Sequence, residues 1–268
     1  MPQIQIGPDA AAVGAAVAGR IVDDLTTALR GGRRFVLGCP GGRTPVSTYH
    51  ALAALAAARE LDLSGLVIAM MDDYVVPDGT SWRNVDGDAH YSCRRFARVE
   101  IQGVLNRVLP TDRWVRDEHV WFPDPKDPAA YEERIADAGG IDCFLLASGA
   151  GDGHVAFNPP GSPVDSLTRI VRLGEQTRRD NLATFPGFGG LDDVPTHGVT
   201  IGIGTIVRHS ASAPMILLGA DKRHAYTRLT TGEGYDPEWP ATVYRLVPPA
   251  MLYADRAAAG ESPDREQR

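Results

Sequence analysis

The chain has 268 residues, with 27 Lys and Arg against 34 Asp and Glu, so its formal net charge at pH 7 is −7. Hydrophobic residues make up 43% and charged residues 23% of the chain, a balance typical of globular proteins. The acidic balance argues against non-specific nucleic-acid binding, which needs a dense basic face. It still allows a small anionic ligand held by a local cluster of donors.

Other broad classes are also disfavoured. No run of about 18 apolar residues is present, so no membrane-spanning helix is expected. Residues 1–14 lack the basic start and apolar core of a secretory signal. The three cysteines (Cys39, Cys93 and Cys143) include no Cys-x-x-Cys pair, and the seven histidines are scattered. We therefore expect a cytoplasmic protein with reduced thiols, no metal site and no cofactor.

The first sixty residues predict a helix, a strand and a second helix. An apolar stripe with a four-residue spacing predicts the first helix, which ends at Gly31. The apolar run Arg34–Cys39 predicts a buried strand. Thr44 as N-cap and Pro45 at the first helical position predict a helix that reaches about Arg59. The stripe consists of Val13, Val17, Ile21, Leu25 and Leu29.

The same alternation continues along the chain. The further predicted strands are Leu66–Met71, His119–Phe122, Ile141–Ala147, Thr200–Ile206, Met215–Leu218 and Met251–Tyr253. The further predicted helices are Tyr91–Arg98, Pro128–Ala138 and one after Asp221. This order predicts an α/β fold with a mostly parallel, Rossmann-like sheet flanked by helices on both faces. We expect one domain over residues 1–256 and a disordered tail over 257–268.

In such sheets ligands bind at the carboxyl ends of the strands, so the loops there are the candidate sites. Gly41 and Gly42 follow the first predicted strand, and Thr44 adds a hydroxyl at the start of a helix. Glycine amides and a helix N-terminus suit a phosphate. The alternative is a tight connection with an ordinary N-cap.

Two further loops carry ionisable groups. Asp72 and Asp73 follow the strand Leu66–Met71, where a partly desolvated carboxylate can act as a general base, although Asp also caps turns. Asp152 and His154 lie in a glycine-rich loop after Ile141–Ala147, and the carboxylate could orient the imidazole. A structural histidine is the alternative.

Three basic residues are weaker candidates. The simplest interpretation of Arg178, Arg179 and Lys222 is that each is a solvated charge on a helix or loop and not a ligand-binding residue. Lys222 has the better case for pointing at an anion, because it follows an apolar run and stands near a helix start.

These loops together resemble the glucosamine-6-phosphate deaminase and 6-phosphogluconolactonase superfamily. The resemblance rests on LGCPGGRTPVSTYHAL, MDDYVVP, LLASGAGDGHVAFNPPGSP, TRIVRL, VTIGIGTIV and ILLGADKRHA, in family order, with WPATVYRL continuing the match. The detail VAFNPPGSP favours the deaminase branch.

The resemblance implies roles for individual residues. Gly41, Gly42 and Thr44 would cradle the substrate phosphate, assisted by Arg178 and Lys222. Asp72 falls on the proton-shuttling carboxylate. Asp152 and His154 fall on the pair that assists sugar ring opening.

One departure concerns the deaminase relay. Deaminases carry a Glu after the Asn of this motif, where this chain has Pro159, so His154 keeps Asp152 but loses a second carboxylate. Asp165 and Glu175 are nearby in sequence, with no basis for choosing between them.

Three functions therefore stay open. The first is an aldose–ketose isomerase or deaminase acting on an amino-sugar 6-phosphate. The second is a lactonase that uses His154 as general base on a phosphosugar lactone, and the third is a non-catalytic sugar-phosphate-binding protein. In each case the expected partner is a phosphorylated sugar rather than nucleic acid or membrane, and a homo-oligomer is possible.

Overall fold

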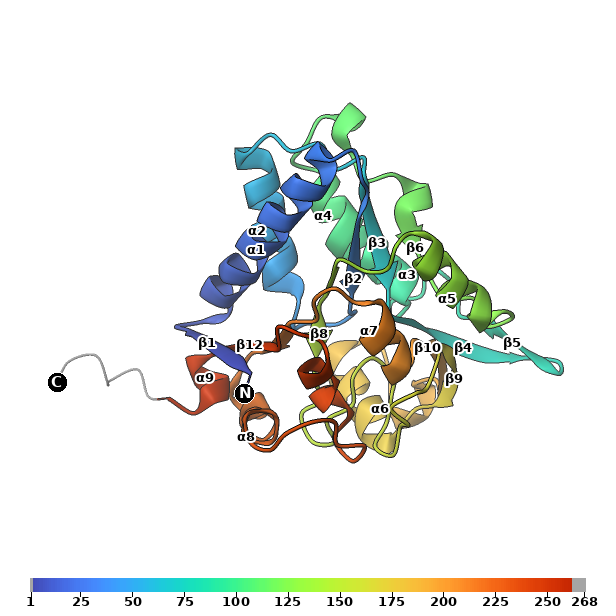
Figure 1. Cartoon of the computed structure of the whole chain (residues 1–268). Coiled ribbons are helices and arrows are strands. Elements are labelled where there is room, and N and C mark those ends of the chain that lie inside the picture. Colours follow the sequence, from blue (N-terminus) through green and yellow to red (C-terminus); the bar gives the residue numbers. More distant parts are fainter. Residues whose placement is uncertain (1, 262–268) are drawn as a thin grey trace.

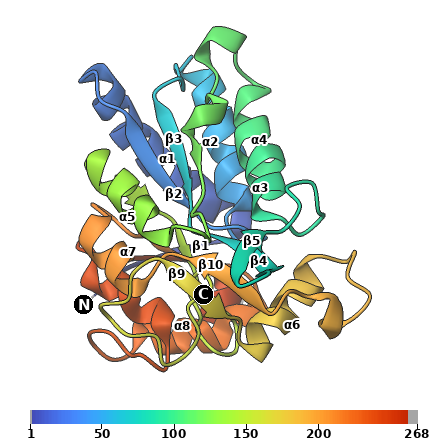
Figure 2. The same cartoon turned by 90° about the vertical axis from the view of Figure 1, so that its right-hand side faces the viewer.

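The structure, a computed structural model, describes residues 2–261 (Figures 1 and 2). Its central feature is a parallel sheet in the order β6-β3-β2-β7/β8-β11-β12-β1. The strands are β1 (Gln3–Gly7), β2 (Phe35–Cys39), β3 (Leu66–Met70), β6 (Val120–Trp121), β7 (Cys143–Phe144), β8 (Leu146–Ala147), β11 (Met215–Leu217) and β12 (Met251–Asp255). Consecutive β7 and β8 pair with β2 and then β11, so they join the two halves of the sheet.

Helices cover both faces of this sheet, because side chains of successive strand residues point to opposite sides. One core lies under α1 (Ala10–Arg30), α2 (Val46–Ala58), α3 (Cys93–Phe96) and α4 (Gly103–Asn106). The other lies under α5 (Pro128–Asp137), α7 (Ile203–His209), α8 (Arg223–Thr230) and α9 (Arg256–Ala259). In β2, for example, Phe35 and Leu37 belong to the first core and Val36 to the second. The predicted mostly parallel sheet with helices on both faces is thus confirmed.

Further helical segments are a π-helical turn (Ala97–Gln102) between α3 and α4, α6 (Glu175–Thr184) and the 3-10 helix Pro240–Leu246.

A second, antiparallel sheet was not predicted. It has the order β5-β4-β10-β9 and consists of β4 (Asp72–Asp78), β5 (Ser81–Asn84), β9 (Arg169–Arg172) and β10 (His197–Thr200). Only Met71 separates β3 from β4, so this sheet begins at the carboxyl end of the parallel one. Its hairpin β4–β5 projects from the body of the molecule (Figure 1).

The structure corrects the predicted strand Thr200–Ile206. Only Thr200 lies in a strand, whereas Ile203 and Ile206 lie in helix α7 with both side chains buried. A short apolar run fits a buried strand or a buried helix equally well. The helix is selected by Gly202, whose backbone N–H donates to Thr205 Oγ1 at 3.2 Å.

Other boundaries also differ from the predictions. The helix predicted at Tyr91–Arg98 runs from Cys93 through the π turn to Asn106. Helix α2 has Pro45 as its N-cap, and Thr44 makes no capping bond. The predicted disordered tail is wrong where α9 continues through Ala259. Residues 262–268 of that tail lie outside the described residues.

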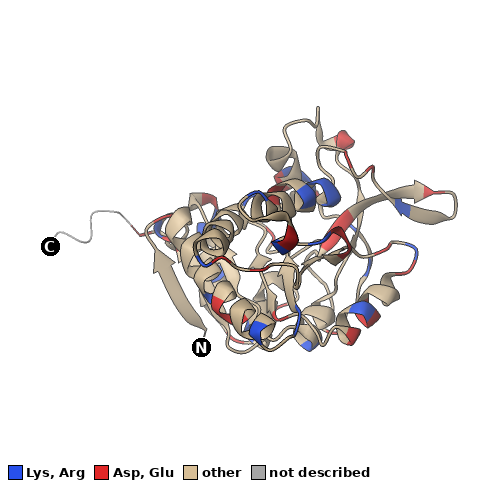
Figure 3. Cartoon of the chain, turned by 90° about the horizontal axis from the view of Figure 1, so that it is seen from above, with Lys and Arg blue, Asp and Glu red and all other residues tan. Residues whose placement is uncertain are grey.

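Several predicted exclusions can be compared with the structure. No helix in residues 2–261 is both long and apolar enough to cross a bilayer. Cys39, Cys93 and Cys143 are free thiols, and all three are buried. In the view of Figure 3, basic and acidic positions are intermingled over the helices.

Candidate active site

A cleft of about 770 Å3 opens at the carboxyl ends of the parallel strands. The loops after β2, β3, β8 and β11 all contribute to its wall. Its lining includes six of the predicted site residues, namely Gly41, Gly42, Thr44, Asp72, His154 and Lys222. The fold therefore brings together four segments that are far apart in the sequence.

The loop after β2 leaves its backbone amides free for an anion. Gly42 has φ +88°, a conformation that favours glycine. In the described part of the chain we find no acceptor for the N–H groups of Gly41, Gly42 or Thr44. The Thr44 side chain, which does not cap α2, lines the cleft instead. These donors and the N-terminus of α2 suit a phosphate group.

Lys222 lines the same cleft as this loop. Its Nζ donates to the Ser148 carbonyl oxygen at 2.9 Å, which aims the ammonium into the cleft. Burial is the main reason that the pKa of Lys222 lies below its usual value, and Arg43 lowers it further. Arg43, which belongs to the loop after β2, also lines the cleft. Two cationic side chains, Lys222 and Arg43, therefore line the same cleft as the free backbone amides.

The structure does not bring Arg178 to the cleft. Its guanidinium donates to the carbonyl oxygens of Leu191 and Val194, and it lines a separate hollow with Arg172. The structure therefore places Arg178 away from the predicted phosphate site. Arg179 pairs with Glu175 on the exposed face of α6, as expected for a solvated charge.

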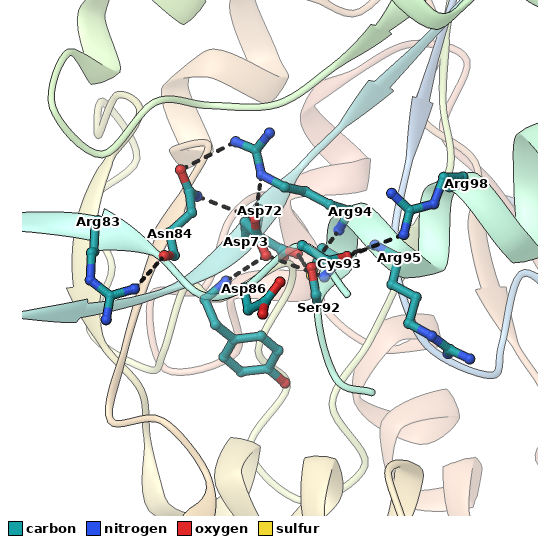
Figure 4. A network of polar contacts seen from close by, with 12 residues as sticks. Asp72, Asp73, Arg83, Asn84, Asp86, Ser92, Cys93, Arg94, Arg95 and Arg98 are labelled. Carbon is teal, nitrogen blue, oxygen red and sulfur yellow. Dashed lines mark hydrogen bonds and ion pairs between the residues drawn. The ribbon is translucent and has the colours of Figure 1, made fainter. Parts of the chain in front are cut away.

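The two adjacent carboxylates have different surroundings (Figure 4). Asp73 accepts four hydrogen bonds, from the backbone N–H groups of Tyr74 and Cys93 and from the side chains of Asn84 and Arg94. These contacts anchor β4 to α3, which is a structural role. Asp72 is only 5% exposed and points into the cleft. The loop pattern alone did not separate the pair, whereas the family resemblance placed Asp72 on the proton-shuttling position. The strand alternation of β4 points the two side chains to different faces.

Asp72 has the electrostatics of a general base. Burial raises its pKa to about 7, with a smaller raising effect from Asp73, while a hydrogen bond from the Cys93 thiol lowers it. A carboxyl group that titrates near neutral pH can both accept and return a proton.

Asp152 and His154 form the predicted pair. His154 Nδ1 lies 2.7 Å from Asp152 Oδ1 and 3.1 Å from Thr177 Oγ1. Burial raises the pKa of Asp152, but the hydrogen bond and charge of His154 outweigh it, so the net pKa is lowered. An ionised Asp152 accepts a hydrogen bond from the N–H at Nδ1. In that tautomer Nε2 carries the lone pair and can act as a base.

The glycines of this loop make room for the pair. A Cβ on Gly149 would lie 2.3 Å from His154 Nδ1, and one on Gly153, which has φ +65°, would lie 2.2 Å from the Trp239 ring. Asn158 Nδ2 donates to Ile201 O at 2.8 Å and so fixes the end of the loop to the segment after β10.

Neither carboxylate considered as a substitute for the missing relay Glu reaches His154. Glu175 pairs with Arg179 on the surface, and Asp165 is exposed to solvent. Besides Asp152, the imidazole contacts the hydroxyl of Thr177 in α6, a side chain that is only 1% exposed. Nothing in the sequence marked this threonine except its place beside Arg178.

Sequence reasoning also missed Tyr74, Cys93, Asp180 and Asn181, which line the cleft. Helix α6, which carries the last two, was not predicted because its apolar stripe is weak. Among the described residues no group of three or more His, Cys, Asp or Glu side chains could hold a metal ion.

The site and the fold define a sugar-phosphate enzyme family. The family model for glucosamine-6-phosphate isomerases and 6-phosphogluconolactonases matches residues 8–248. The chain belongs to this family. It is 35% identical over 262 residues to a glucosamine-6-phosphate deaminase of Mycolicibacterium smegmatis, covering 96% of this chain and 91% of that protein. It is 34% identical to the deaminase of Bifidobacterium longum subsp. infantis, covering 97% and 92%.

Solved structures share the fold. A monomeric glucosamine-6-phosphate deaminase superposes with a TM-score of 0.80 at 24% identity, covering 97% of this chain and all of that one. The 6-phosphogluconolactonase of Trypanosoma cruzi superposes with a TM-score of 0.67 at 18% identity, covering 97% and 96%.

Proposed function

We propose that this protein is an aldose–ketose isomerase and deaminase that converts glucosamine 6-phosphate, or a close relative, to a ketose 6-phosphate and ammonia. The observation that carries the proposal is the buried Asp72 in the cleft, with a pKa of about 7. The deaminase names of the relatives support the same choice. A protein that only binds sugar phosphates has no use for such a group.

Binding comes first. The substrate phosphate is held by the amides of Gly41 and Gly42, the Thr44 hydroxyl and the Lys222 ammonium. Holding the far end of the sugar uses binding energy to position the reacting carbons.

Ring opening and proton transfer follow. His154 takes the proton from O1 and gives one to O5, which breaks the C1–O5 bond and yields the open aldehyde. Asp72 then removes the proton from C2 and returns it to C1. In the same conversion O1 gains a proton and the C2 amino group loses one, so that a hydroxyl forms at C1 and an imine at C2. Water hydrolyses this imine and releases ammonia, with no net oxidation or reduction.

The alternative is hydrolysis of a phosphosugar lactone with His154 as general base. Pro159 favours it, because lactone hydrolysis does not need the missing relay Glu. It leaves Asp72 without a role, which is why we place it second. The intracellular, cytoplasmic location expected from the thiols stays a prediction.

Paired assays of the purified protein test the proposal. Glucosamine 6-phosphate is supplied while ammonia and fructose 6-phosphate are followed, and 6-phosphogluconolactone is supplied while acid release is followed. The proposal predicts ammonia and ketose in equal amounts. If the protein releases acid from the lactone but no ammonia from the amino sugar, it is a lactonase and the proposed deaminase function is wrong.

A further inference from the structure

Cys93 is the side chain that contacts the candidate base. Its Sγ lies 3.4 Å from Asp72 Oδ1, and in residues 2–261 this is the one side-chain hydrogen bond that we find for Asp72 (Figure 4). Both side chains are buried, at 6% and 5% exposure, and both line the cleft. The contact leaves Asp72 Oδ2 without a protein partner in that part of the chain.

The position of the thiol is fixed by the start of α3. Ser92 caps this helix by accepting from the backbone N–H of Arg94 at 3.1 Å. The backbone N–H of Cys93 donates to Asp73 Oδ1 at 3.2 Å. A Cβ on Gly41 would lie 3.9 Å from Cys93 Sγ. The thiol is therefore close both to Asp72 and to the loop of residues 41–44, which we propose holds the substrate phosphate and call the phosphate loop.

The surroundings keep the sulfur protonated. Burial, followed by the charges of Asp72 and Asp73, raises the pKa of Cys93 well above its usual value. It is therefore an S–H donor at neutral pH rather than a thiolate. The other titratable groups near Asp72 are Asp73, Tyr74 and Tyr131, and those across the cleft are Arg43, His154, Asp180, Asp221, Lys222 and Asp255.

We propose that Cys93 is a positioning residue for proton transfer: its thiol holds Asp72 Oδ1 and leaves Oδ2 free to exchange a proton with the substrate. This inference rests on the proposed function, in which Asp72 is the base. A thiol is a weak donor, so it orients the carboxylate without stabilising the ionised form as strongly as a hydroxyl would. The carboxylate thus keeps its affinity for a proton while its orientation is fixed.

Two substitutions at this position change the donor in opposite directions. Cys93→Ser supplies a stronger donor and favours the ionised carboxylate, so the acidic limb of the kcat/KM profile for glucosamine 6-phosphate moves to lower pH. Cys93→Ala removes the donor and moves the limb to higher pH. We expect each shift to be about half a pH unit. We also expect Cys93→Ala to lower kcat about tenfold with little change in KM, because the carboxylate is no longer oriented.

The control is Cys143→Ser, which alters a buried thiol in β7 outside the cleft. It should leave both pH limbs in place, even if it lowers the melting temperature. A merely structural role for Cys93 would likewise leave the limbs unmoved. The proposal is overturned if neither Cys93 variant shifts the acidic limb, or if both shift it in the same direction.

An infrared measurement on the unsubstituted protein makes the test independent of folding of the variants and of activity. The S–H stretching band of Cys93 should shift as Asp72 loses its proton, because the acceptor becomes charged. Its midpoint should coincide with the acidic limb near pH 7. An S–H band that does not change through this range overturns the proposal. If no ammonia forms but the band titrates, the proposed function fails while the Cys93–Asp72 contact stands.

Discussion

Asp72 and Asp73 show how two identical neighbouring side chains acquire different roles. Asp73 is held by four donors, including the Arg94 guanidinium, and it fixes β4 against α3. Asp72 turns to the other face of the strand and has a thiol as its side-chain donor. A buried carboxylate with so few donors lowers the stability of the fold, and we interpret that cost as the consequence of a pKa suited to proton transfer.

The destabilisation by the ionised Asp72 carboxylate predicts how Asp72→Asn changes the melting temperature at different pH values. The pKa of Asp72 is raised from 3.8 to about 7, so its stabilising contribution is complete below its unfolded pKa and is lost as pH rises through the folded value. Asn does not titrate. The melting temperature of Asp72→Asn relative to the unsubstituted protein should therefore be higher at about pH 8 than at about pH 4, by several degrees.

Differential scanning calorimetry at the two pH values measures this difference. Asp78→Asn, at the distal end of β4, is the control and should show no such change. Equal melting-temperature differences at both pH values would mean that folding does not raise the pKa of Asp72.

The Asp152–His154 pair makes a separate prediction. Asp152→Asn keeps the shape of the side chain but removes the charge that holds the Nδ1 proton. We expect kcat for glucosamine 6-phosphate to fall by about 10²-fold or more, because the tautomer with a basic Nε2 is no longer favoured. Steady-state kinetics beside Asp165→Asn, a carboxylate outside the cleft, checks this. An unchanged kcat in Asp152→Asn would show that the carboxylate does not orient the imidazole.

At the scale of elements, α6 takes part in the site through Thr177. Its hydroxyl contacts His154 Nδ1. Pro159, which replaces the relay Glu, lies near the same place, because a Cβ on Gly174 would lie 3.7 Å from Thr177 Oγ1 and 3.9 Å from Pro159 Cβ. Helix α6 therefore links the imidazole to the wall of the cleft that carries Asp180 and Asn181.

The contact predicts opposite outcomes for two substitutions of Thr177. Thr177→Val keeps the volume and removes the hydroxyl, so kcat should fall about three- to tenfold through looser orientation of His154. Thr177→Ser restores the hydroxyl and should recover most of the activity. Kinetics of the two variants at one pH decide the matter. Equal activity of Val and Ser would assign Thr177 to packing alone.

Elements with strong patterns could be predicted from the sequence, and elements defined by tertiary pairing could not. Helix α1 has a clear apolar stripe, and β2 and β3 are short buried runs, so all three were found. Strands β9 and β10 pair across long sequence separations and carry mixed polar residues. Likewise Asp72, His154 and Lys222 were found from strand-end loops, whereas Cys93 enters the cleft only because α3 packs against β4.

At the scale of the whole molecule, one chain supplies every candidate group. The phosphate loop, Asp72, the Asp152–His154 pair and Lys222 all belong to the same cleft or contact it. The net charge of −7 is compatible with an anionic ligand, because Lys222 and Arg43 are concentrated at one loop. The fold places these cations where the amides of Gly41 and Gly42 are free.

This arrangement predicts that activity does not depend on association of chains. Specific activity towards glucosamine 6-phosphate should stay constant over a wide dilution series, whatever the oligomeric state. Sedimentation velocity at the same concentrations gives that state. A loss of activity that follows dissociation would show that a second chain completes the site.

If Asp72 moves the proton between C2 and C1, as we propose, its loss must appear in the kcat of Asp72→Asn. The variant keeps the shape of the cleft but has no group to accept a proton, so kcat for ammonia release from glucosamine 6-phosphate should fall by about 10²- to 10⁴-fold or more. Calorimetry establishes that the variant is folded. If a folded Asp72→Asn protein releases ammonia at the rate of the unsubstituted protein, Asp72 is not the group that moves the proton between C2 and C1.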